Sequence, residues 1–270
     1  MFTKLLAYEI RSRYRADARS FGAFIVTIAV ASGIVAAGLP GISGSTATLA
    51  YALCALTPVA CAIAAMADYW KTLYGQRGYF TMSLPISGTV IFWAKITRIV
   101  IECLLALALA VGGILAVASA AAWSDGISLA EYTAGPRSLV AGVPTSTVVI
   151  MIVVQVLVWL SWLVQGSAVM SIGAEGRFNH MGFGAPIIGF VLLYIVNQVL
   201  STVGTFFLPL SVTTDGHFST EIMWTSYRAT MGTDGQPNVI GIGSYILVPL
   251  FALILGLWAS RSIEKHTSLR

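Results

Sequence analysis

The chain has 270 residues, of which 57% are hydrophobic and 10% charged, with a net charge of +4. Soluble domains carry about 25% charged residues, so this composition excludes an ordinary soluble protein and indicates several membrane-spanning segments. The modest positive excess indicates contact with anionic lipid of the inner leaflet, and it does not imply nucleic acid.

Six apolar runs each approach the roughly 20 residues that cross a bilayer as a helix. The runs are continuous and do not alternate with polar residues, so we expect helices and not the strands of a barrel. The predicted spans are 21–39, 47–67, 96–122, 147–173, 186–208 and 241–260. The predicted fold is therefore an all-α membrane protein, with residues 1–270 forming a single transmembrane domain.

The segment before the first span, residues 1–20, is basic and amphipathic. Phe2, Leu5, Ile10 and Tyr14 recur at helical spacing among cations, a pattern typical of an interfacial helix, which we call the elbow helix. A frayed basic tail is the alternative. Because the following apolar run is longer than the roughly 7–15 residues of a cleaved signal peptide, we expect an uncleaved anchor.

Between the second and third spans, residues 68–95 form a polar and aromatic loop that is longer than usual connections. Asp68 is expected to begin a short helix whose apolar face includes Trp70, Leu73 and Tyr74. Gly75 and Gly78 are expected to end this helix on either side of Arg77. After Pro85, Ser87 is expected to begin a second short helix that leads into Lys95.

Few polar groups interrupt the spans. Glu102 lies about one turn inside the third span with Arg98 four residues earlier, so the two can pair on one helix face. That pair either holds the helix end together or takes part in transport or partner contact. Asn197 and Gln198, near the middle of the fifth span, are expected to hydrogen-bond across helices or to line a substrate route.

Two further segments, 123–146 and 209–240, connect spans and are too polar to cross the membrane. Trp224 and Tyr227 in the second of them are typical of aromatic anchors at a membrane interface. An external gate, a substrate contact and a folded cap are all compatible with this segment.

The cations predict the orientation of the spans. Lys and Arg accumulate in cytoplasmic loops, and all 15 of them except Arg137 and Arg228 fall on the side of the two termini. Both termini are therefore expected to be cytoplasmic, and the loops 68–95 and 209–240 to be cytoplasmic and extracellular.

Enzyme signatures are missing from the sequence. It has no G-x-x-x-x-G-K-[ST] phosphate loop, no G-x-S-x-G elbow and no H-E-x-x-H motif. Its three cysteines and three histidines show no metal-ligand spacing. We expect no catalytic, metal or cofactor site in the chain itself.

The loop from Leu73 to Ser87, followed by Lys95, resembles that of permease subunits of ABC-2 type bacterial ABC transporters. The matching positions are Gly75, Gly78, Tyr79, Thr81, Leu84, Pro85, Ser87 and Lys95. Arg77 departs from the pattern, because an acid is common there. The motif covers under a tenth of the chain, and the six-span layout with its basic amphipathic start extends the resemblance over nearly all of it.

The resemblance implies an exporter subunit in the bacterial cytoplasmic membrane, with a coupling helix between its second and third spans. Two permease subunits, identical or different, would pair with two copies of a separate ATPase that binds ATP and magnesium. The substrate would be amphipathic: a peptide antibiotic, a drug or a lipid-like molecule. The implied ATPase-coupling residues are Trp70, Leu73, Tyr74, Gly75, Arg77, Gly78, Tyr79 and Pro85.

Two other functions remain compatible with the sequence. An ion-driven secondary transporter would need buried acids at the middle of the membrane, and repeated halves. A membrane-embedded enzyme would need converging catalytic groups, whereas an assembly factor would need neither.

Overall fold

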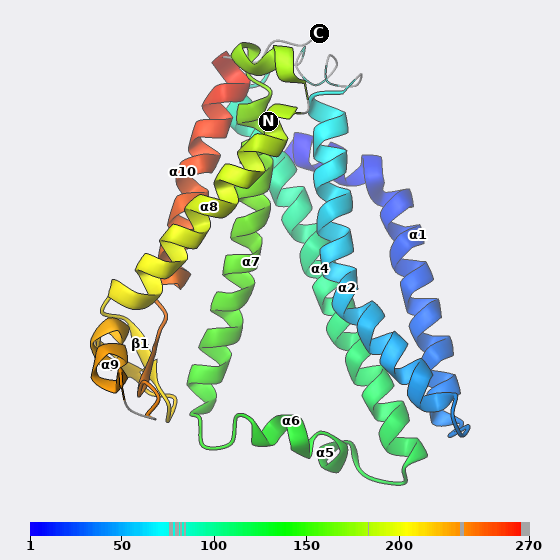
Figure 1. Ribbon diagram of the computed structural model, residues 1–270. Coiled ribbons are helices and arrows are strands. Elements are labelled where there is room, and N and C mark those ends of the chain that lie inside the picture. Colours follow the sequence, from blue (N-terminus) through cyan, green and yellow to red (C-terminus); the bar gives the residue numbers. More distant parts are fainter. Residues whose placement is uncertain are drawn as a thin grey trace. The chain divides into compact units, whose positions relative to one another are not determined.

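The computed structural model describes residues 1–75, 78, 81, 83, 85–182, 184–232 and 235–265. Within this part of the chain, six helices are long and apolar enough to cross a membrane, and they fall on the six predicted spans (Figure 1). The protein is thus a predominantly helical, multi-pass membrane protein. It divides into two compact units, Met1–Lys71 with Ala94–Leu139, and Thr72–Trp93 with Val140–Arg270.

The first unit contains α1 (Phe2–Ala36), α2 (Ser43–Leu73) and most of α4 (Gly88–Ser124). One apolar cluster of its core consists of Phe24, Ile28, Ala50, Cys54, Ala110 and Val117. Gly113 permits the close approach of α4 to α2, because a Cβ atom there would lie 2.7 Å from the Cys54 sulfur. This approach follows the general rule that small residues let membrane helices pack tightly.

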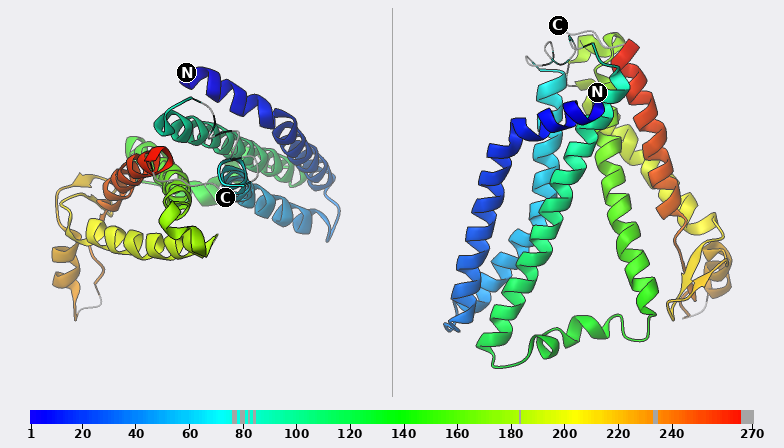
Figure 2. Two further views of the ribbon diagram at one scale, coloured as in Figure 1. Left: turned by 90° about the horizontal axis from the view of Figure 1, so that it is seen from above. Right: turned by 180° about the vertical axis from the view of Figure 1, so that it is seen from behind.

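α1 is one helix of 35 residues, where the sequence predicts an elbow over 1–20 and a span over 21–39. Gly22 alone does not break it, because a single glycine costs a helix only about 1 kcal/mol. The first turns nevertheless run across the direction of the rest of α1 (Figure 2). Leu5 and Glu9 are buried there, whereas Phe2, Ile10 and Tyr14 are exposed.

The predicted short helices of the 68–95 loop are extensions of the membrane helices. α2 continues to Leu73 with Asp68 well inside it, so Asp68 does not begin a helix. The first helix breaker after Pro58 is Gly75, which explains why α2 extends past residue 67. Likewise α4 begins at Gly88 and runs through Lys95 without a break, because no Gly or Pro follows until Gly112.

The second unit is built on α7 (Thr145–Gly173), α8 (Gly184–Phe207) and α10 (Ser244–Lys265), with the short 3-10 helix η1 (Gly176–Met181) between α7 and α8. Buried apolar residues from all three long helices, including Leu163, Leu193 and Leu255, form its interior. The end of α7 meets the start of α8 closely, since a Cβ atom at Gly173 would lie 2.8 Å from the Pro186 nitrogen.

Segment 209–240 folds into a small cap, so the fold is not purely helical. Strands β1 (Ser211–Thr213), β2 (Phe218–Ser219) and β3 (Val239–Gly241) form an antiparallel sheet in the order β2-β1-β3, beside α9 (Met223–Thr230). The rings of Trp224 and Tyr227 stack 6.0 Å apart and both contact Phe206 of α8. In the first unit, α5 (Leu129–Tyr132) and α6 (Ala134–Ser138) occupy the other predicted connection.

Candidate functional site

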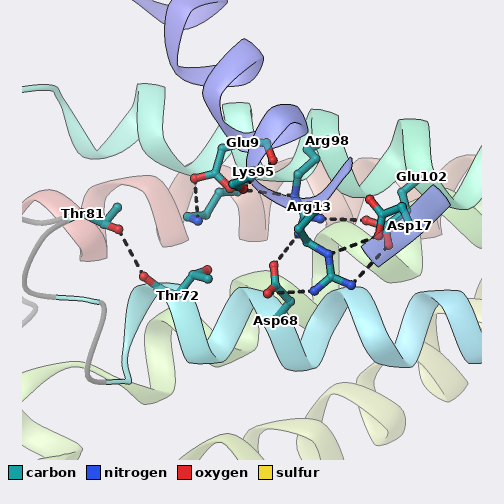
Figure 3. A network of polar contacts seen from close by, with 10 residues as sticks. Glu9, Arg13, Asp17, Asp68, Thr72, Thr81, Lys95, Arg98 and Glu102 are labelled. Atoms are coloured by element: carbon teal, nitrogen blue, oxygen red, sulfur yellow. Dashed lines mark hydrogen bonds and ion pairs between the residues drawn. The ribbon is translucent and has the colours of Figure 1, made fainter. Parts of the chain in front are cut away.

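A cluster of charged side chains joins α1, α2 and α4 in the first unit (Figure 3). Its residues come from the first half of α1, the last turns of α2 and the first half of α4. We call it the charged cluster. Its members are Glu9, Arg13, Asp17, Asp68, Lys95, Arg98 and Glu102.

Arg98 lies close to three carboxylates of the charged cluster. Its two terminal nitrogens donate hydrogen bonds to Glu102, at 2.7 Å, and to Asp68, at 3.1 Å. Its Nε lies 3.9 Å from a Glu9 carboxylate oxygen. Arg98 and Glu102 therefore meet as their spacing of four residues predicts, and Arg98 also connects α4 to both other helices. The planar guanidinium, with five donors in a rigid fork, suits such contacts with several carboxylates.

Lys95 and Glu9 form the most deeply buried ion pair of the described residues. The Lys95 ammonium donates to Glu9 across 2.8 Å, and the two side chains are 2% and 8% exposed. The contact joins residues 86 positions apart, linking the first turns of α1 to α4. Removing one partner of such a pair leaves an uncompensated buried charge, which destabilises a protein by about 3–5 kcal/mol.

Arg13 lies on the outer side of the charged cluster, between Asp68 and the carboxylates of Asp17 and Glu102 (Figure 3). It is 2.8 Å from Asp68, 3.4 Å from Asp17 and 3.8 Å from Glu102. Arg13 and Asp17 are each about a quarter exposed. This part of the cluster therefore has access to whatever surrounds the helices.

Among the described ion pairs of the cluster, carboxylates outnumber cations. Four carboxylates face three cations in these ion pairs, which gives a net charge of −1 when all are ionised. Asp17 is the least engaged acid, because its single described ion pair is the long one to Arg13. The described residues contain no group of three or more His, Cys, Asp or Glu that could hold a metal ion. The cluster can hold three helix ends together and can attract a positive charge at Asp17.

Sequence reasoning missed the contribution of α1 to this cluster. Glu9, Arg13 and Asp17 recur every four residues with alternating sign, a pattern that places them on one helix face. That pattern predicts an ion-paired face. The apolar residues between them point instead to a lipid-facing helix, and the sequence does not show which face meets α4.

The expected ATPase-coupling residues differ in how accessible they are. Trp70 and Tyr74 are half-buried and Pro85 is exposed, whereas Leu73 has no exposed surface. Tyr69, one turn before Leu73 on α2, is also fully buried. The predicted face thus packs largely inside the chain because α2 continues through it, and Leu73 does not present its side chain to a partner.

The remainder of this segment is described only in part. Gly75 is half-buried and Gly78 is buried. The Thr81 hydroxyl donates to the Thr72 carbonyl across 3.2 Å, which returns the segment to the end of α2 (Figure 3). Tyr79 and Leu84, which carry part of the family resemblance, and Arg77, which departs from it, lie outside the described residues.

The second unit contains a neutral counterpart of the charged cluster, which we call the amide pair. The Asn197 amide of α8 donates to the Gln165 side-chain oxygen of α7 across 2.7 Å, and Gln165 donates to the Val248 carbonyl of α10 across 3.0 Å. Both side chains are buried. Asn197 therefore bridges helices. Gln198 does not, because it is exposed and its described bond is to Tyr194 of the same helix.

Comparisons with protein-family models, with curated proteins and with solved structures found no match for this chain. The function is therefore argued from the residues of the chain itself. The charged cluster, the amide pair and the 68–95 segment are the features that any account of it has to explain.

Proposed function

We propose that the chain is the permease subunit of an ABC-2 type exporter, which moves an amphipathic substrate across the cytoplasmic membrane of a bacterium. The observation that carries the proposal is the sequence from Leu73 to Ser87, followed by Lys95, between the second and third of six spans. The chain has no phosphate-binding loop of its own, so the energy for transport comes from a separate ATPase that binds ATP and magnesium.

The ATPase contact consists of the turn after α2 and the residues that frame it. Trp70, Tyr74 and Pro85 offer exposed or half-buried surface, and we assign Arg77 and Tyr79 to the contact from their positions in the motif. Leu73 supports this surface from within the chain. In this account the segment faces the cytoplasm, and a second permease subunit and lipid cover the remaining membrane-facing surfaces.

In this proposal, the charged cluster transmits movement of the ATPase contact to the membrane helices. α4 is continuous from Gly88 through Lys95 to Glu102, so a force on its first turn acts directly on Lys95 and Arg98. Lys95 donates a hydrogen bond to Glu9 of α1 across 2.8 Å, and Arg98 lies 3.9 Å from the same carboxylate group. Because buried ion pairs are geometrically specific, α1 would follow α4 when the ATPase closes.

Copurification with the product of an adjacent ATPase gene tests the proposal. We expect a complex that hydrolyses ATP, and we expect hydrolysis to vanish when the phosphate-loop lysine of the ATPase is changed to alanine. Tyr79→Ala and Gly78→Pro should each leave the complex folded but uncouple hydrolysis from transport. Phe218→Ala, which removes an exposed aromatic ring from the cap, is the matched control and should change neither activity. A chain that purifies without any nucleotide-binding subunit contradicts the proposal.

The charged cluster also favours a second candidate, an ion-driven carrier, because ionisable groups buried in membrane helices mark ion pathways in such proteins. A carrier would move its substrate in vesicles without ATPase and would stop when an ionophore collapses the ion gradient. The exporter would keep working under the ionophore as long as ATP is supplied.

A further inference from the structure

A pocket of about 420 Å³ opens between α1 and α2, wholly inside the first unit, and the charged cluster forms one end of it. Arg13, Asp17 and Glu102 line the charged end. Phe24 and Leu53 belong to the apolar remainder. The volume falls within the roughly 300–1,000 Å³ typical of small-molecule sites. The pocket therefore has the division into a charged and an apolar part that an amphipathic molecule requires.

The acidic side chains at the charged end of the pocket favour a positively charged ligand. Two carboxylates, Asp17 and Glu102, but only one cation, Arg13, are among the described residues that line this end of the pocket, and Asp17 is the acid with the weakest described engagement. Asp17 and Glu102 also line a second, smaller pocket, of about 180 Å³, on another side of α1. The excess negative charge is therefore accessible from cavities, and a positive group placed there would complete the cluster.

The rest of the pocket offers little to a polar ligand. The hydroxyls of Thr27 and Thr57 donate to the carbonyls of Ala23 and Leu53 in their own helices, at 2.9 and 2.7 Å. Their hydrogens are thus already used, and the surface around them is mostly apolar. A hydrocarbon chain would be favoured in this part by about 25 cal/mol per Å² of apolar surface removed from water.

We propose that this pocket binds an amphipathic amine, with its ammonium group between Asp17 and Glu102 and its hydrocarbon part along Phe24 and Leu53. As the identification of the cargo, the proposal rests on the exporter function argued above. The ammonium supplies three donors to carboxylates that have free lone pairs. Arg13 keeps its 2.8 Å contact with Asp68 when the ligand engages Asp17.

Binding of radiolabelled n-dodecylamine to the purified full-length chain in detergent tests the site without any ATPase. We expect saturable binding that unlabelled n-dodecanol, of equal chain length but uncharged, displaces much more weakly. Asp17→Asn should weaken amine binding about tenfold, the factor expected for losing a charge-assisted hydrogen bond, and Asp17→Glu should restore it. Asp125→Asn, a change at an exposed acid outside the cluster, should have no effect.

A second variant tests the pocket without changing any charged residue of the cluster. Ala60→Phe fills the apolar part of the pocket from α2 and should weaken the binding of both n-dodecylamine and n-dodecanol. Equal amine affinity in the wild-type chain and in Asp17→Asn, or equal affinity for the amine and the alcohol, would overturn the site.

Short-chain phosphatidylethanolamine separates a free amine from a lipid headgroup. Its phosphate is repelled by the excess carboxylate, so we expect it not to displace n-dodecylamine, and displacement would overturn the assignment to a free amine. Because none of these measurements involves ATP, loss of amine binding with an intact ATPase complex refutes the pocket alone. Amine binding by a chain with which no ATPase copurifies from cells refutes the exporter alone.

Discussion

Each unit joins three membrane helices through polar side chains, but the two units use different kinds of side chain. The first unit uses the charged cluster, whose members lie within the first half of α1 and α4 and near the end of α2. The second uses the amide pair, in which Asn197 lies near the middle of α8. Charges are far costlier than amides in the centre of a bilayer. On these energetic grounds we expect the charged cluster near the membrane surface and the amide pair deeper within the membrane.

The same contrast assigns different tasks to the units. The outer ion pair of the charged cluster, between Arg13 and Asp17, is about a quarter exposed and can therefore be broken and re-formed. A buried amide pair has no such exposure and mainly fixes helix register. We therefore expect mutations in the charged cluster to have larger and more strongly coupled effects than mutations in the amide pair.

The largest effect is expected for Lys95→Met. It leaves Glu9 buried without its 2.8 Å partner and should lower the free energy of unfolding by about 3–5 kcal/mol. The double variant Glu9→Gln/Lys95→Met should recover most of this loss, because no unpaired charge remains. Unfolding in mixed micelles with increasing dodecyl sulfate measures both. Lys71→Met, at an exposed lysine, is the control and should be nearly neutral. If the two single changes simply add in the double variant, the pair is not coupled and the account of the cluster fails.

A smaller effect is expected from tight helix packing, for which adjacent glycines of α4 provide a matched pair. Gly113→Ala places a Cβ atom 2.7 Å from the Cys54 sulfur, whereas Gly112→Ala meets nothing within 4 Å. Overpacking of this kind costs about 1–3 kcal/mol. The first variant should therefore unfold at lower dodecyl sulfate concentrations than the wild type, and the second should be unchanged or slightly more stable. Equal stability of the two variants would mean that α2 and α4 are not in contact there.

The smallest effect is expected in the amide pair. Asn197→Leu removes the hydrogen bond to Gln165 and should cost about 0.6–1.7 kcal/mol, the range measured for side-chain hydrogen bonds between membrane helices. Gln198→Leu, one position away, loses only a contact within α8 and should leave the unfolding curve unchanged. Gln198→Leu would contradict the assignment if it destabilised the chain as much as Asn197→Leu.

The sequence predicts the parts of this structure that depend on local pattern. Hydrophobic run length places all six long helices, and the spacing of four residues predicts the contact between Arg98 and Glu102. The same reasoning ends α2 at residue 67, because it takes Asp68 for a helix start. Local pattern does not reveal that Arg13 and Arg98, which are distant in sequence, form ion pairs with Asp68. These ion pairs neutralise the acid within the continuing helix.

The parts that the sequence could not predict are contacts between distant residues. Lys95 enters the sequence argument only through a family motif, and its partner Glu9 is 86 positions away. The cap has strands of only two or three residues, too short for alternation to mark them. Gly241 approaches the Thr205 carbonyl so closely that no Cβ atom fits there, a contact that the sequence does not reveal.

A cross-link from the 68–95 segment to the ATPase tests the central claim most directly. In a chain whose Cys54, Cys61 and Cys103 are changed to alanine, Pro85→Cys introduces a thiol at an exposed position of the segment, and Asp125→Cys introduces one after α4. The account predicts that a short bifunctional thiol reagent joins position 85 to the ATPase and that ATP alters the yield. Position 125 should give no product. Absence of a cross-link from position 85 in a complex that still hydrolyses ATP, or equal products from both positions, would contradict the account.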